Sequence, residues 1–145
     1  MLIAIFVFSS QEGEETYAVS QGLLRTFVGK IVSRLPSLSP YGIEDDIRKY
    51  AHIVEFFLLS VALFMLSSAL FRKKGPVFHF AVSLILSAAA AGADEWHQTF
   101  VPGRNGTLRD VMIDAMGFVP GALICLAVSL LIRRFKRNKK AGNDR

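Results

Sequence analysis

Residues 94–117 read DEWHQTFVPGRNGTLRDVMIDAMG, and this polar stretch separates two long apolar segments of the chain. Two of its acids, Asp110 and Asp114, stand one helical turn apart at the start of the second apolar segment. Charged groups are costly inside a hydrocarbon layer, so acids at such a position indicate a functional role. The fold and the candidate site therefore both depend on how this stretch is placed between its apolar neighbours.

Three apolar runs of the chain are long enough to cross a membrane. Residues 53–71 contain one charge, Glu55, residues 76–93 contain none, and residues 111–132 contain only Asp114. A helix that crosses the hydrocarbon core needs about 20 mostly apolar residues. The sequence therefore predicts an all-α integral membrane protein, a bundle with three full transmembrane helices over residues 48–71, 76–98 and 109–132. All 145 residues are expected to form one domain.

The N-terminal part of the chain contains two shorter candidate elements. Residues 1–8, MLIAIFVF, are apolar but cover less than half of a span, and the polar sequence SSQ follows at once. We interpret residues 1–9 as the end of an apparently truncated fourth membrane helix, with a short interfacial segment as the alternative. Residues 17–35 place apolar side chains at helical spacing along one stripe, with polar side chains opposite. That pattern predicts an amphipathic interfacial helix, although the stripe could also pack on the other helices.

The positive charge of the chain is concentrated after the last apolar run. The net charge is +5, and residues 133–145, RRFKRNKKAGNDR, carry seven basic residues and one acid. Directly after a membrane span, such a tail is expected to lie in the cytoplasm on anionic lipid rather than to bind nucleic acid. The basic hairpin RKK at 72–74 is expected on the same side, so the polar stretch is placed at the extracytoplasmic face. The single cysteine, Cys125, excludes an internal disulfide.

Two groups of polar side chains are predicted to meet at this outer face. Arg48, His52 and Glu55 stand at i, i+4 and i+7, so they share one face at the start of the first full span. At the end of the next span, the same spacing rule places Asp94 and Gln98 together and directs Glu95 and His97 elsewhere. A buried carboxylate such as that of Asp114 needs a cation or a proton, which the first group or a nearby arginine would supply.

Three roles for these groups remain open from spacing alone. The acids and His52 could act as general acid and base or hold a metal-bound water, beside an arginine that binds phosphate. They could instead relay protons or bind a transported ion, or they could form a polar network that only locks the helices together. A divalent metal is compatible with these residues and is not required by them, so the identity of any metal or cofactor is left unknown.

Three motifs in this order resemble those of the VanZ-like membrane proteins, named for the teicoplanin-resistance protein. They are RKYAHIVEF at 48–56, DEWHQTFVPGR at 94–104 and RDVMIDAMGFVPG at 109–121, and FSSQ at 8–11 is similar as well. The resemblance covers residues 6–132 and implies a bacterial membrane protein of four helices with a role in tolerance of glycopeptide antibiotics. Family members usually begin with a full first span, so residues 1–9 are expected to correspond to the end of that span. The resemblance does not supply a reaction.

The resemblance and the spacing together give the candidate site. Its expected ligands are membrane lipids and a lipid-linked envelope precursor or a glycopeptide-related molecule, and nucleic acid is not expected. Whether the protein is an enzyme, and its oligomeric state, are left undecided. The candidate catalytic residues are His52, Glu55, Asp94, Glu95, Gln98, Asp110 and Asp114, and the candidate anion-binding residues are Arg48, Arg104 and Arg109.

Overall fold

Three helices form the described part of the molecule, which is a computed structural model covering residues 31, 33–37, 42–102 and 106–143. They are α4 (Ile43–Leu70), α5 (Pro76–Gln98) and α6 (Leu108–Asn143), and the described residues contain no strand. Each helix is long and apolar enough to cross a membrane, over Asp45–Leu70, Pro76–Gln98 and Leu108–Lys139. The prediction of an all-helical protein with three full spans is therefore confirmed. The predicted elements at residues 1–9 and across most of 17–35 lie outside the described residues.

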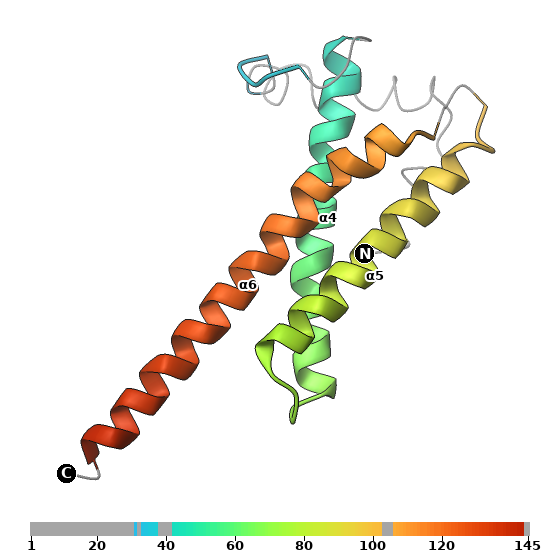
Figure 1. Ribbon diagram of the computed structural model, residues 1–145. Coiled ribbons are helices and arrows are strands. Elements are labelled where there is room, and N and C mark those ends of the chain that lie inside the picture. Colours follow the sequence, from blue (N-terminus) through green and yellow to red (C-terminus); the bar gives the residue numbers. More distant parts are fainter. Residues whose placement is uncertain (1–30, 32, 38–41, 103–105, 144–145) are drawn as a thin grey trace.

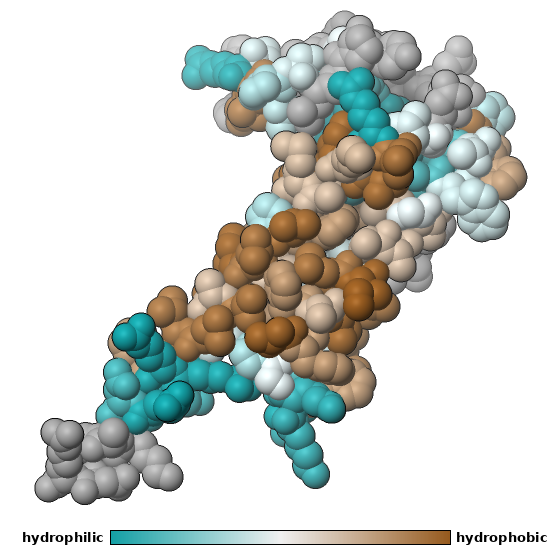
Figure 2. Space-filling view, viewed as in Figure 1, coloured by the Kyte–Doolittle hydropathy of each residue, from teal (hydrophilic) through white to brown (hydrophobic). Residues whose placement is uncertain are grey.

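The surface of the bundle has the distribution of side chains that a bilayer requires. Apolar side chains gather over the middle of the molecule, whereas hydrophilic side chains lie toward its two ends (Figure 2). Many large apolar residues on all three helices are exposed, among them Met65, Ile85 and Ile124. Water would penalise such a surface, whereas lipid tails solvate it, so the exposed band is the part of the molecule that faces the hydrocarbon.

The helices begin and end where the local sequence favours a boundary. Gly42 precedes α4 with a φ of 102°, a left-handed conformation that glycine adopts without strain. A short basic hairpin joins α4 to α5, and Pro76 occupies the first turn of α5, where its missing N–H costs no hydrogen bond. Thr107 precedes α6, and its hydroxyl oxygen accepts the backbone N–H of Asp110 at 3.2 Å. This is the usual geometry of a helix N-cap.

Two helices extend beyond their predicted bounds. Helix α4 begins at Ile43 rather than at residue 48, so Asp45 and Asp46 lie in its first turns, where carboxylates favour the positive end of the helix dipole. Helix α6 continues to Asn143 rather than ending at residue 132. Lysine and arginine are good helix formers, and no proline or glycine interrupts residues 122–141, so the basic tail starts as a continuation of the helix. The helix also continues through Pro120, which lies inside it.

Helix α6 packs against both α4 and α5, and glycine makes the closest approach to α4 possible (Figure 1). A Cβ atom on Gly117 would overlap the backbone oxygen of Ile53, and one on Gly121 would overlap the hydroxyl of Ser60. Small residues commonly allow this approach between membrane helices. A small apolar cluster then fills the space among the three helices; its buried members are Phe56, Leu59, Ala91 and Phe118.

Candidate functional site

His52 lies where the three helices meet at one end of the bundle. Its Nδ1 atom is 3.6 Å from Oδ1 of Asp114 on α6 and 4.0 Å from Oδ2 of Asp94 on α5. Asp94 is 0% exposed and Asp114 is 2% exposed, while the side chain of His52 is 13% exposed. Each of the three helices therefore contributes one titratable side chain to a contact that is almost closed to solvent.

The last turn of α5 contributes a linked group of three side chains. The Nε2 amide of Gln98 donates to Oδ2 of Asp94 at 2.9 Å and to Oε1 of Glu95 at 3.0 Å. The expectation that Glu95 points elsewhere is wrong, because Glu95 is only 6% exposed. Residues three and four apart are neighbours on a helix, so one glutamine amide reaches both acids. His97 lies outside this group and is half-buried.

Glu95 also ties α5 to the start of α6. Its Oε2 atom accepts the backbone N–H of Thr107 at 2.9 Å. The hydroxyl of Thr107 in turn donates to Oδ2 of Asp110 at 2.7 Å. Thr107 is not among the residues predicted from the sequence, although a threonine three residues before an acid at a helix start is a recognisable capping signal. This chain of bonds fixes the position of Asp110 relative to the last turn of α5.

Lys49 is a second residue that the sequence analysis missed. It is only 8% exposed, and its Nζ atom is 3.2 Å from Oδ2 of Asp45 and 3.3 Å from Oδ1 of Asp110. A buried lysine is rare unless it is paired, and here the pair joins α4 to α6. The signal that would have found it is the i, i+4, i+7 series of Asp45, Lys49 and His52, which lies beside the Arg48 series.

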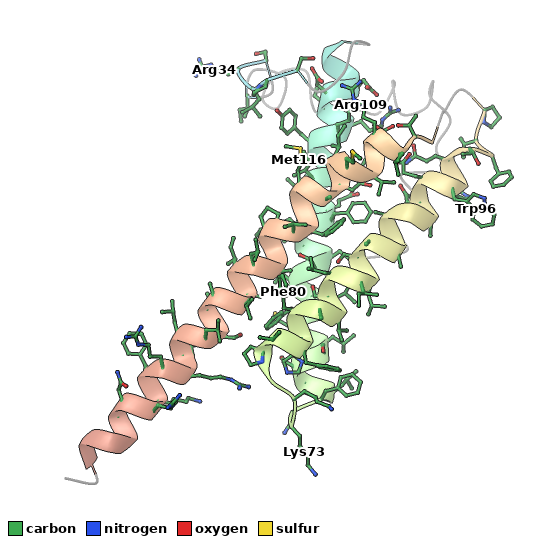
Figure 3. All side chains as sticks on the ribbon, in the orientation of Figure 1. Arg34, Lys73, Phe80, Trp96, Arg109 and Met116 are labelled. Carbon is green, nitrogen blue, oxygen red and sulfur yellow. The ribbon has the colours of Figure 1, made fainter. Side chains whose placement is uncertain are left out.

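The predicted arginines and Glu55 occupy different places around the site. Arg48 forms an ion pair with Asp45 in the preceding turn and remains 37% exposed. Arg109 is exposed, at the opposite end of the bundle from Lys73 (Figure 3), and Arg104 lies outside the described residues. Glu55 is half-buried one turn deeper than His52, close enough to interact electrostatically with Asp94 and Asp114.

A small, partly open pocket with a cavity volume of about 20 Å³ lies over these groups. Seven of its eight lining residues are polar, so the pocket offers hydrogen-bond partners to a water or to a single polar group. The structure thus brings most of the predicted site together; of the predicted residues that the structure describes, Glu55, Asp94 and Arg109 lie outside the pocket lining. The lining residues are Arg48, Lys49, His52, Glu95, Gln98, Asp110, Ile113 and Asp114.

In the described part of the chain, two carboxylate oxygens at this end of the bundle lack a hydrogen-bond partner. Among the described residues, Oδ1 of Asp94 and Oδ2 of Asp114 are buried atoms that form no hydrogen bond. Buried polar atoms normally have a partner, so these two oxygens are open to a proton, a water or a polar ligand group. Within the same part of the chain, no set of three histidine, cysteine or acidic side chains is placed to hold a metal ion.

The comparison with known families agrees with the three motifs. A family model described as VanZ/LLP1 matches residues 1–132. The match covers all three helices except the basic extension of α6. Comparisons with curated proteins and with solved structures give no match.

Proposed function

The chain belongs to the VanZ/LLP1 family, and from that premise we propose that its polar site acts on a lipid-linked envelope precursor at the outer face of the bacterial membrane. This activity would contribute to tolerance of glycopeptide antibiotics such as teicoplanin. The observation that carries the proposal is the contact of His52 with Asp94 and Asp114, because it joins a base to two buried acids drawn from three helices. Histidine is the side chain that most often moves a proton to or from a bound ligand.

The surroundings of the pocket favour an amphiphilic ligand. Trp96 and Phe100 are each 69% exposed beside the end of α5, and their rings form an edge-to-face pair with centroids 5.5 Å apart. Exposed aromatic rings at a helix end are typical of the membrane–water boundary. A ligand at this level would place its polar head in the pocket and its apolar chain along the lipid-facing side of the bundle. Lipid-linked precursors have this division between head and chain.

Cationic side chains at the pocket favour a ligand that carries an anionic group. Arg48 lines the pocket with a third of its side chain exposed, and Lys49 lies beside it. A guanidinium is well suited to bind a phosphate or carboxylate through two parallel hydrogen bonds. In this proposal, Arg48 orients the ligand, with Arg104 and Arg109 as further contacts, while His52 and the buried acids transfer the proton.

The proposal is tested by separate alanine substitutions of the residues that would bind or react. His52→Ala, Asp94→Ala, Arg104→Ala and Asp114→Ala are each produced in a bacterial host, and their membrane levels are matched by immunoblot. The expected result is that each variant lowers teicoplanin tolerance to that of a strain lacking the protein and that unprocessed lipid-linked precursor accumulates. If all four variants insert normally and retain tolerance, the proposal is wrong.

A non-enzymatic role is the second candidate, and the paired polar groups favour it. Lys49 joins α4 to α6, and Glu95 joins α5 to the start of α6, so part of the network holds helices together. A protein that only binds or shields an envelope component should tolerate Asp114→Glu, which preserves the charge. A proton-transferring carboxylate should lose most activity on that change, because the added methylene displaces the reacting oxygen by about 1 Å. Tolerance of the Asp114→Glu strain therefore separates the two roles.

A further inference from the structure

The end of the molecule away from the polar site is densely cationic. The hairpin between α4 and α5 supplies three basic side chains and the extension of α6 supplies five, all of them exposed. Among the described residues 71–75 and 133–139, there is no carboxylate to neutralise them. We call this surface the basic end; its members are Arg72, Lys73, Lys74, Arg133, Arg134, Lys136, Arg137 and Lys139.

The hairpin and the α6 extension form one surface rather than two. The Nη2 atom of Arg133 donates to the backbone oxygen of Lys74 at 3.5 Å, although the residues are 59 positions apart. Hydrophilic side chains of both segments gather at the same end of the space-filling view (Figure 2), where Lys73 also projects (Figure 3). The extension is helical, so its cations are spaced along one helix, and the first of them lies beside the hairpin.

Exposed aromatic rings lie among these cations. Phe71 is 47% exposed, Phe78 is 36% exposed and Phe135 is 71% exposed. The Nζ atom of Lys74 lies 5.5 Å from the centre of the Phe78 ring. Cations beside exposed aromatic rings, at the end of an apolar span, lie at the level of phospholipid headgroups. Nucleic acid would neutralise the positive charge of these side chains but would leave the adjoining apolar rings in water.

We propose that the basic end is a binding surface for anionic phospholipids, whose phosphate groups lie between the hairpin and the α6 extension while their acyl chains cover the neighbouring aromatic rings. The proposal does not depend on the activity of the polar site, which lies at the other end of the bundle. Zwitterionic lipids would leave the excess positive charge unneutralised, so the surface should prefer lipids with a net negative charge. Each cation near such lipids strengthens binding about fivefold.

The test measures lipid binding by the full-length protein in detergent micelles. Native mass spectrometry follows retention of phosphatidylglycerol and phosphatidylcholine by the wild type and by the quadruple variant Arg133→Gln/Arg134→Gln/Lys136→Gln/Arg137→Gln. Glutamine keeps helix propensity while removing charge. The matched control is Arg34→Gln, an exposed arginine at the opposite end (Figure 3). We expect the wild type and the control to prefer phosphatidylglycerol by at least about tenfold, and the quadruple variant to lose that preference.

Two results with these proteins would overturn the proposal. They are equal retention of the two lipids by the wild type and undiminished preference in the quadruple variant. If the quadruple variant misfolds, the salt dependence of the wild type decides the question. Raising the salt concentration from about 0.05 to about 0.5 M should weaken phosphatidylglycerol retention several-fold, because salt screens exposed charges. Salt-independent retention would contradict the proposal.

Discussion

Replacing Lys49 with methionine should weaken the contact between α4 and α6. Methionine keeps most of the length of lysine but removes the ammonium that lies 3.2 Å from Asp45 and 3.3 Å from Asp110. Asp45 retains its ion pair with Arg48, and Asp110 retains its hydrogen bond from Thr107. The loss should therefore be smaller than that for a wholly broken buried pair, and larger than that for an exposed one. We expect the free energy of unfolding to fall by about 1–3 kcal/mol.

A double-mutant cycle isolates the part of this loss that belongs to the Lys49–Asp110 pair. Unfolding free energies are measured by titration with denaturing detergent for Lys49→Met, Asp110→Asn and the double variant. Lys73→Met, at an exposed position of the hairpin, is the matched control and should change stability by less than about 0.5 kcal/mol. We expect a coupling energy of about 1 kcal/mol or more between the two substitutions. Additive effects within about 0.5 kcal/mol would refute the inference that this ion pair stabilises the bundle.

Two further predictions address packing and sidedness. Gly117→Ala should destabilise the protein by about 1–3 kcal/mol, because its Cβ would overlap the backbone oxygen of Ile53. Gly92→Ala, where no atom lies within 4 Å, should be neutral or slightly stabilising in the same unfolding titration, and equal losses would contradict the packing described here. In a variant whose native cysteine has been replaced, a membrane-impermeant maleimide added to intact cells should label Arg104→Cys and leave Lys73→Cys unlabelled. The reverse pattern would invert the predicted orientation.

The three spans could be predicted from sequence because the thickness of the bilayer dictates their length. Apolar runs interrupted by single acids leave few alternatives to membrane helices, and the bounds of α5 agree with the prediction at both ends. The start of α4 and the end of α6 were harder to predict from the sequence. Outside the hydrocarbon, polar residues are compatible with a helix as well as with a loop. Hydropathy alone therefore does not show where such a helix stops.

The candidate site was predictable as a layer but not as a set of contacts. Helical spacing placed His52 on the same face as Arg48, and charge counting placed both at the same end as Asp94. Spacing does not determine which side of a helix faces its neighbours, which is why Glu95 was directed away from the site and Lys49 was overlooked. Those orientations depend on how α6 crosses α4, and Gly117 permits that crossing through a close approach that only the assembled bundle reveals.

Teicoplanin tolerance of an Asp114→Asn strain, at matched membrane level, decides whether the polar site acts by transferring a proton. Asparagine preserves the shape of the side chain but cannot exchange a proton with His52 or a ligand. The free energy of unfolding of the Asp114→Asn variant is measured in parallel, because removing one partner of a buried pair can destabilise the bundle and lost folding must be separated from lost function. The account predicts that tolerance falls to the level of a strain lacking the protein. Wild-type tolerance in the Asp114→Asn strain would contradict it.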